Sequence, residues 1–371
     1  MHHDTTHEEA RADLPEPRQI LARSGFGAAD PLFAADLRAS TDLTQAREVV
    51  ASHASRLWTE SARTGPDPVD DRPLYWARLV LRSRLRAWEP SFPLGADDRA
   101  GLLHLFETAS RGITDLDFPP GDRWVRVVVT GFDPFHLDTD PECSNPSGAA
   151  ALDLHGWTFP VGDRTAVVRC AVFPVRWADF DAGIVEEALA DQYGTADAVI
   201  TLSRGRDRFD LEVWNGVWRG GGVDNLGVSR TGRAPVAGSD VPEWTRTSLP
   251  LERIVADTDG PHAMVANTEV TEVPEGGAAP VTRPDGPSPG SASRQGGGGD
   301  YLSNEIAYRN TLLRDRAGSR VAAGHVHLPR TRRPDEHADT LARTRALVAV
   351  VASEALSAPP PEDDPGDPGG L

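Results

Sequence analysis

The sequence contains little cysteine, no lysine and no long apolar run. Two cysteines, Cys143 and Cys170, occur among 371 residues, which excludes a disulfide framework and a multi-cysteine zinc site. Because no run of about 18 apolar residues occurs, we expect no membrane span. Residues 1–10 are acidic and histidine-rich and lack the basic and apolar segments of a signal peptide. These absences predict a cytoplasmic protein without a membrane partner.

Positive charge is scarce relative to negative charge. Lysine and arginine together number 38 against 56 aspartates and glutamates, so the formal net charge is −18. Because such a chain repels phosphate backbones, we expect no nucleic-acid partner. The glycines at 296–299 are not followed by the Gly-Lys-Ser/Thr of a phosphate loop, and no Gly-x-Ser-x-Gly elbow occurs. No motif indicates a cofactor.

The first third of the chain has a helical pattern. Apolar residues make up 39% of the sequence, and the length suits one α/β domain with an additional piece. Within 73–88 the apolar residues recur at helical spacing, and no strand pattern occurs before residue 120. Residues 1–120 are therefore predicted to be a helical N-terminal extension. It could pack on the main domain or dock a partner.

From residue 124 the pattern changes to alternating strands and helices. The β-branched run at 125–130 is typical of a buried parallel strand. Further strands are expected at 166–173, 196–202, 211–218, 263–270 and 320–326, and helices at 179–193, 247–255, 304–314 and 335–356. This alternation predicts, for residues 124–357, an α/β fold with an open, twisted, mostly parallel sheet flanked by helices.

Two segments have low complexity. Residues 274–299 are rich in Pro, Gly and Ser and cannot bury much apolar surface, so we expect a disordered insert. Residues 358–371 form an acidic, Pro-rich tail that is also predicted to be disordered.

The first candidate motif is Thr-Gly-Phe-Asp-Pro-Phe at 130–135, followed by Asn145 and a proline. A strand ends there in a turn that presents two aromatic rings, Phe132 and Phe135. Two rings so spaced can form the walls of a small apolar pocket, or can simply pack the turn.

The second motif follows the strand at 196–202. Ser203 and Arg204 form its end, and the carboxylates of Asp210 and Glu212 come soon after. Carboxylates in such a place are most often surface charges. The arginine could stabilise an oxyanion, or could bind a free carboxylate instead.

The third motif is a glycine run leading into Ser303 at the start of a helix. A residue there faces free backbone N–H groups, which suit a nucleophile and an oxyanion, although a serine in such a place is most often an N-cap. The fourth motif is His-Val-His-Leu-Pro at 325–329, in which His327 ends a strand two residues after His325. A histidine pair at alternate positions also fits a metal, but no third ligand lies at a telling spacing, so no metal is expected.

In this order, the four motifs resemble those of the pyroglutamyl peptidases (pyrrolidone-carboxylate peptidases), a cysteine-peptidase family. That family has T-G-F-(D/E)-P-F, a G-Q turn with an acid, Y-(L/V)-C-N, and H-(V/L)-P. The resemblance extends from about residue 124 to 356. The chain departs from it at Ser303, which replaces the nucleophilic cysteine, at Ser203-Arg204, which replace Gly-Gln, and in an acidic insert at 136–144.

The resemblance implies an active site. Ser303 would attack an amide after an N-terminal pyroglutamyl residue or a similar small amide, His327 would act as base and then acid, and Glu212 would orient His327. Asp210 is the fallback for Glu212. The substrate would be bound by residues that line the pocket, namely Phe132, Phe135, Asn145 and Arg204.

The replacement of cysteine by serine leaves the activity open. A cysteine thiol beside a histidine is often ionised near neutral pH, whereas a serine hydroxyl is not. The serine therefore needs a base placed to take its proton during the attack. The chain could therefore be an active serine hydrolase, an inactive relative that binds pyroglutamyl or related ends, or an interaction protein. Bacterial family members often assemble as tetramers, so a homo-oligomer is also compatible with the resemblance.

Overall fold

The structure is a computed structural model that describes residues 5–62, 69–238 and 240–357. The acidic tail expected at 358–371 lies outside the described residues. No helix in the part of the chain that the structure describes is both long and apolar enough to cross a membrane.

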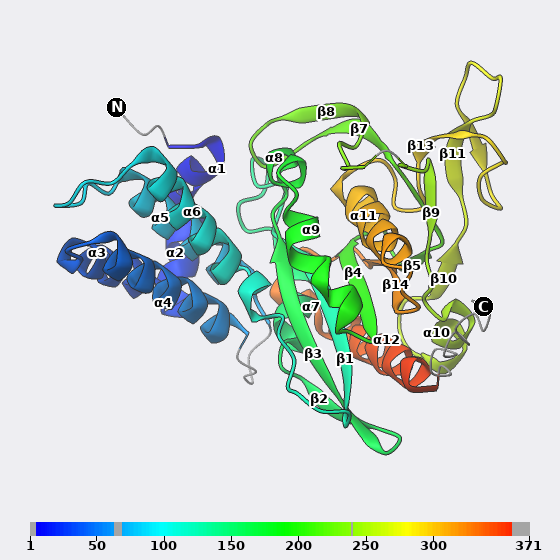
Figure 1. Cartoon of the computed structure of the whole chain (residues 1–371), viewed down its shortest axis with the longest axis horizontal. Coiled ribbons are helices and arrows are strands. Elements are labelled where there is room, and N and C mark those ends of the chain that lie inside the picture. Colours follow the sequence, from blue (N-terminus) through cyan, green and yellow to red (C-terminus); the bar gives the residue numbers. More distant parts are fainter. Residues whose placement is uncertain (1–4, 63–68, 239, 358–371) are drawn as a thin grey trace, which may run out of the picture.

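The N-terminal helical extension is confirmed. Its helices lie beside the sheet in Figure 1, coloured blue to cyan. They are α1 (His7–Ala10), η1 (Arg11–Asp13), α2 (Pro15–Ser24), η2 (Phe26–Ala28), α3 (Ala29–Ala39), α4 (Leu43–Ser61), α5 (Arg72–Ala87) and α6 (Ala96–Ser110), followed by η3 (Ile113–Asp115). The side chain of Asp42 caps α4 by accepting the N–H of Gln45. The buried faces of α4, α5 and α6 meet in one apolar cluster that continues under the main sheet.

The main sheet has seven strands in the order β10-β5-β14-β4-β1-β3-β2. Their bounds are β1 (Trp124–Phe132), β2 (Thr158–Val161), β3 (Arg164–Phe173), β4 (Ala198–Arg204), β5 (Phe209–Glu212), β10 (Met264–Asn267) and β14 (Ala322–Leu328). The four central strands β14, β4, β1 and β3 are parallel. At the edges, β2 is antiparallel to β3 and β5 is antiparallel to β14, whereas β10 is parallel to β5. The expected mostly parallel sheet is therefore confirmed.

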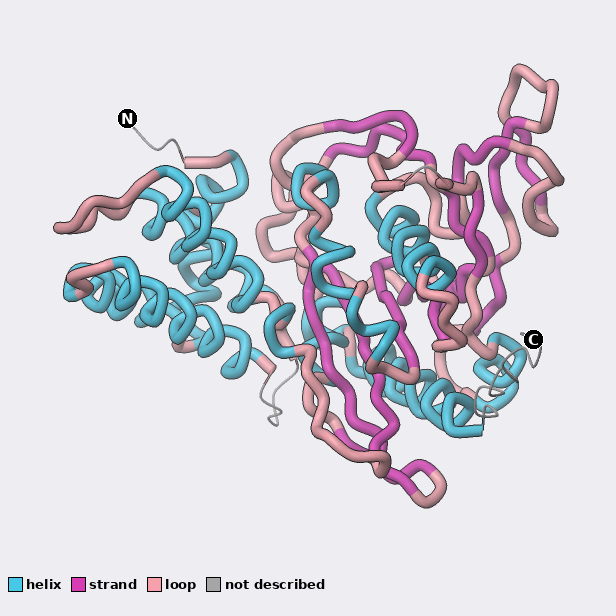
Figure 2. The backbone as a smooth tube through the Cα atoms, viewed as in Figure 1, coloured by secondary structure: helices cyan, strands magenta, loops and turns pink. Residues whose placement is uncertain are grey.

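Helices cover both faces of this sheet (Figures 1 and 2). One face packs on α7 (Pro146–Leu154) and α12 (Ala338–Ser357), and the other on α8 (Trp177–Asp181), α9 (Ile184–Leu189) and α11 (Leu302–Arg316). A further helix, α10 (Leu251–Asp257), packs against β10 and α12. Because both faces are covered, Val127, Val128 and Val129 of β1 are all buried, as a continuous β-branched run predicts.

Two expected elements are divided into shorter ones. The helix expected at 179–193 is broken into α8, α9 and η4 (Asp191–Gly194), because Gly183 has a left-handed φ of 86°. The strand expected at 211–218 is divided among β5, β6 (Trp214–Gly216) and β7 (Trp218–Val223). In two small antiparallel pairs, β6 joins β9 (Trp244–Arg246) and β7 joins β8 (Ser229–Arg233).

The segment expected to be a disordered insert at 274–299 forms strands. In it, β12 (Val281–Arg283) and β13 (Ala292–Gln295) pair on either side of β11 (Val270–Val273) in a three-stranded antiparallel sheet. The buried Glu272 carboxylate accepts the Arg283 Nε–H (2.9 Å) and the Ser288 N–H (2.6 Å). The sequence expectation was wrong here because polar bonds, rather than apolar residues, hold this sheet together.

Candidate active site

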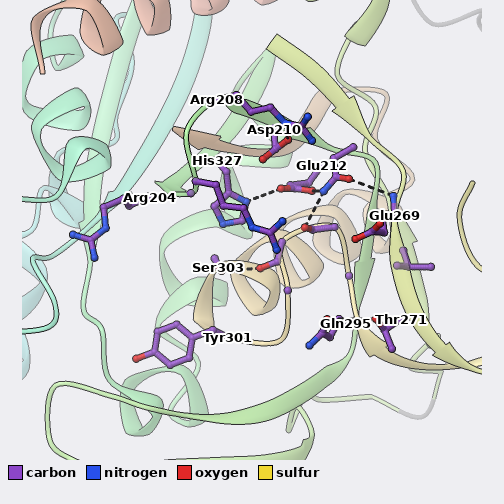
Figure 3. A pocket seen from close by; sticks show the side chains of 18 of the residues that line it. Arg204, Arg208, Asp210, Glu212, Glu269, Thr271, Gln295, Tyr301, Ser303 and His327 are labelled. Atoms are coloured by element: carbon purple, nitrogen blue, oxygen red, sulfur yellow. Dashed lines mark hydrogen bonds and ion pairs between the residues drawn. The ribbon is translucent and has the colours of Figure 1, made fainter. Parts of the chain in front are cut away.

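Three predicted residues, Ser303, His327 and Glu212, come from three elements that meet at one edge of the main sheet (Figure 3). Ser303 is the second residue of α11, His327 is the penultimate residue of β14, and Glu212 is the last residue of β5. Because β5 is antiparallel to β14, Asp210 lies opposite His327 and Glu212 lies opposite His325 in the ladder.

A buried carboxylate holds the His327 ring. Glu212 Oε1 is 2.6 Å from His327 Nδ1, and the two residues are 1% and 8% exposed. Burial raises the pKa of Glu212, while the hydrogen bond from His327 opposes that rise. Asp210 pairs instead with Arg208 Nε at 2.6 Å. Of the two carboxylates considered from the sequence, the structure brings Glu212 to the histidine.

Ser303 lies inside the helix and is not its N-cap. The N-cap is Tyr301, which has extended backbone angles and makes no side-chain capping bond. The alternative interpretation of Ser303 as an N-cap is therefore wrong. Its hydroxyl donates to the carbonyl of Gly298 at 3.1 Å, and no hydrogen bond between described residues joins it to His327. Ser303 lies in the first turn of α11, where backbone N–H groups have no intrahelical partners.

The glycine run Gly296–Gly299 lies against these residues. A Cβ added to Gly297 would clash with Glu212 Oε2, and one added to Gly296 would clash with the side chain of Asn304. At Gly298 the added atom would be 3.2 Å from His327 Cε1. Glycine is thus required at 296 and 297, because the backbone of the run packs directly on Asn304 and on the Glu212–His327 pair.

Asn267 is a site residue that the sequence reasoning missed. Its Nδ2 donates to Glu212 Oε2 (2.8 Å) and to the carbonyl of Gly297 (3.0 Å). It is the last residue of β10 and lies beside Glu212 in the parallel ladder. A polar residue at the end of the strand next to β5 was the available signal. Asn267 thus ties Glu212 to the glycine run.

His325 is a buried structural residue. Thr201 Oγ1 and Ser203 Oγ each lie 2.8 Å from its ring nitrogens, and it is 0% exposed. Burial, with His327 nearby, lowers the pKa of His325 well below its usual value, so the ring is neutral. Within the described ranges, no group of three or more His, Cys, Asp or Glu side chains could hold a metal ion.

The aromatic residues lie on the other side of Ser303. Phe132 is buried and stacks on Phe180, with ring centroids 6.2 Å apart. Phe135 is partly exposed. Asn145 caps α7 by accepting the N–H of Ser147 and donates to the carbonyl of Asp133. Phe132 and Asn145 therefore support the local structure in addition to facing the site.

The predicted residues line two adjoining spaces. A cavity of about 410 Å³ is bordered by Ser303, His327, Glu212, Phe135 and Arg204. A hollow of about 40 Å³ is bordered by Phe132, Phe135, Asn145, Arg204 and Ser303. Ser303 borders both spaces. The two groups joined by a bond in front of its hydroxyl would therefore each lie in a different space.

Arg204 ends β4, and its side chain is directed away from His327 and Ser303 (Figure 3). Its Cζ lies 4.0 Å from the centre of the Phe135 ring, and its Nη1 donates to Cys143 Sγ at 3.1 Å. Burial lowers the pKa of Arg204, although the nearby Cys143 opposes that effect. The orientation separates this guanidinium from an oxyanion at Ser303.

Models of two adjoining domains match the chain. The PA0049 N-terminal domain matches residues 1–107, and the PA0049 C-terminal domain matches residues 126–237 and 256–332. The uncharacterized protein PA0049 of Pseudomonas aeruginosa is 30% identical over 446 residues, covering 87% of this chain and 80% of that protein. The chain belongs to the PA0049 family. Ser303, His327 and Glu212 all fall within the part that matches the PA0049 C-terminal domain.

Two solved structures resemble this PA0049-family chain in the arrangement of helices and strands alone. Pyrrolidone carboxyl peptidase from Pyrococcus furiosus aligns with a TM-score of 0.44 and 20% identity, over 62% of this chain and 99% of that chain. Pyroglutamyl peptidase I from Bacillus amyloliquefaciens aligns with a TM-score of 0.43 and 21% identity, over 62% of this chain and 94% of that chain.

Proposed function

We propose that this chain is a serine-dependent acyl hydrolase that cleaves pyroglutamyl peptides or a related small amide. The observation that carries the proposal is the buried Glu212–His327 pair beside Ser303. Glu212 engages Nδ1 of the ring, which leaves Nε2 of His327 available as a base. The resemblance of the sequence motifs to pyroglutamyl peptidases supports the substrate class.

The reaction would use Ser303 as nucleophile. As its Oγ attacks the amide carbonyl carbon, His327 Nε2 takes the hydroxyl proton, and the imidazolium is stabilised by Glu212. The first-turn N–H groups of α11 donate to the oxyanion. His327 then protonates the leaving amine as the C–N bond breaks. Water, deprotonated by His327, hydrolyses the Ser303 ester and restores the free hydroxyl.

The two spaces around Ser303 suit the two parts of such a substrate. The hollow beside Phe132 and Phe135 would hold the small acyl group, and the larger cavity would hold the leaving peptide. For attack, the Ser303 hydroxyl must turn from the carbonyl of Gly298 toward His327. This turn is a rotation about one side-chain bond.

The bond from Ser303 to Gly298 also favours a second candidate function. If the hydroxyl stays on that carbonyl, the site binds an acylated amine end without cutting it. The two functions predict different behaviour of a cysteine variant, because a thiolate is nucleophilic without a base that acts during the attack.

The test is hydrolysis of pyroglutamyl-aminocoumarin by the wild type, Ser303→Ala and Ser303→Cys. Turnover that is lost in Ser303→Ala and kept in a control, Ser91→Ala at an exposed serine, supports the hydrolase. Turnover by Ser303→Cys but not by the wild type supports binding without cleavage. If neither protein turns over this amide or a glutaryl amide, the hydrolase proposal is wrong.

A further inference from the structure

Four arginines whose side chains have no acidic partner in the described chain gather beside the candidate active site. Arg204, Arg206, Arg330 and Arg332, here called the arginine cluster, form no ion pair with any carboxylate that the structure describes. Neighbouring arginines behave differently, because Arg208 pairs with Asp210 and Arg333 with Asp140. In a chain of net charge −18, a group of unpaired cations is unexpected at any one place.

The sheet topology brings the arginine cluster together. Because β4 and β14 are parallel neighbours, the turns that follow them run side by side. The N–H of Gly205 donates to the carbonyl of Leu328 (2.7 Å), and the N–H of Arg330 donates to the carbonyl of Arg206. The charges of Arg330 and Arg332 add to burial in lowering the pKa of Arg204, as expected for neighbouring cations.

Arg204 connects the arginine cluster to the hollow beside Ser303. Arg204 and Ser303 both line the hollow, which has a volume of about 40 Å³. An acyl group held in this hollow at Ser303 therefore lies beside the guanidinium of Arg204. The ring of Phe135 lies against the guanidinium, and the donor contact of Arg204 within the described chain is to the weak acceptor Cys143 Sγ. Its other N–H groups are free to bind a carboxylate in a bidentate manner.

We propose that Arg204 binds a carboxylate on the acyl part of the substrate, and that Arg206, Arg330 and Arg332 attract this anion to the site. The substrate is then the amide of a dicarboxylic acid, with one carboxyl at Ser303 and the other at Arg204. A glutaryl amide has this form, whereas the pyroglutamyl ring has the same number of backbone carbons and no charge. The cleavage part of this proposal rests on the proposed hydrolase function.

The turnover experiment compares glutaryl-aminocoumarin with pyroglutamyl-aminocoumarin. The wild type should cleave the glutaryl amide with a kcat/KM at least about tenfold higher, and Arg204→Met should lose that advantage. Methionine keeps an unbranched apolar contact with Phe135. The control is Arg164→Met, which removes an exposed arginine at the start of β3, far along the sheet from the site. A preference for the pyroglutamyl amide, or no change in Arg204→Met, overturns the proposal.

A binding experiment separates this proposal from the hydrolase proposal. Ser303→Ala protein is titrated with glutarate and with neutral glutaramide by calorimetry. Glutarate should bind at least about tenfold more tightly than glutaramide, and binding should weaken in salt and in Ser303→Ala/Arg204→Met. This outcome supports the anion site even if the wild type cleaves nothing. Equal affinity for the two ligands, or no binding of glutarate, contradicts the proposed carboxylate site at Arg204.

A second variant keeps the test valid if Arg204→Met fails to fold. Arg206→Met/Arg330→Met changes two exposed side chains of the arginine cluster and leaves the hollow intact. We expect it to weaken glutarate binding several-fold at low salt, with the loss vanishing at high salt. An unchanged affinity at low salt would argue against attraction by the arginine cluster.

Discussion

The two walls of the candidate site are held in place by different interactions, one by buried charged side chains and the other by close backbone packing. The aromatic wall, residues 131–147, is held by charged side chains. The Asp133 carboxylate lies between Arg78 and Arg111 in the interior, and Asp71 accepts the N–H of Asn145 at 2.9 Å. The glycine wall, Gly296–Gly299, has no side chains, and a Cβ added at Gly296 or Gly297 would collide with Asn304 or Glu212.

The difference shows that the first third of the chain takes part in building the site. Asp71 and Arg78 lie next to or on α5 of the helical extension, yet they hold the loop that carries Phe132 and Phe135. The glycine wall depends on residues of the main domain, such as Asn267 and Glu212. One wall should therefore respond to lost charge and the other to added volume.

Removing the Asp133 carboxylate should have the largest effect. In Asp133→Ala, Arg78 and Arg111 are left buried without their shared partner, so the free energy of unfolding should fall by about 3–5 kcal/mol. Urea unfolding monitored by tryptophan fluorescence measures this. Asp13→Ala removes an exposed pair with Arg18 and should cost about 1 kcal/mol or less. Equal losses in the two variants would contradict the role of Asp133.

Adding volume to the glycine wall should come next. Gly297→Val forces Glu212 away from His327 or the run away from both, which should reduce stability by about 3 kcal/mol and abolish any hydrolysis. The control is Gly101→Ala in α6, where a Cβ meets open space and should stabilise the helix. A Gly297→Val protein with wild-type stability would show that the wall is not tightly packed.

Removing the amide of Asn267 should have a smaller effect on the glycine wall. Asn267→Leu leaves Glu212 Oε2 and the carbonyl of Gly297 without their donor, which should cost about 2 kcal/mol in urea unfolding. If the chain is a hydrolase, kcat should fall more than KM rises, because Asn267 holds Glu212 in place. The exposed Gln19→Leu should be nearly neutral. A change in KM alone would indicate direct contact with substrate.

The smallest effect should come from His325, which lies two residues before His327 on β14. Its pKa in the folded protein lies well below its usual value, so the unfolded chain takes up the proton first as pH falls. Stability from the neutral ring is present above about pH 6.5 and is lost below it, by about 1.4 kcal/mol at pH 5.5. The difference in unfolding free energy between wild type and His325→Gln should shrink by this amount from pH 8 to pH 5.5. A constant difference would mean that the pKa of His325 is the same in the folded protein and in the unfolded chain.

Much of the fold could be predicted because its signals are local. The β-branched run at 125–130 marks a central strand, and helical spacing marks the extension. The four ordered motifs also pointed to Ser303, His327 and Glu212, which the structure brings to one edge of the sheet.

The remainder depends on contacts between residues far apart in sequence. The bonds of Asp133 to Arg78 and of Asn267 to Glu212 have no local pattern. The segment 274–299 has the composition of a disordered chain, and its strands form because Glu272, which lies before it, supplies a buried acceptor. Whether Arg204 faces Ser303 or Cys143 is a choice of side-chain torsion that sequence does not encode locally.

The shared partner of Arg78 and Arg111 has a consequence for how the two halves of such chains can be recombined. A chimera that joins the helical third of one PA0049-family protein to the α/β part of another creates a new interior at this point. If the incoming half lacks the matching charge, it leaves a buried ion alone. The arginine of α5 and the aspartate after β1 should therefore be exchanged as one unit, whatever the position of the junction between them.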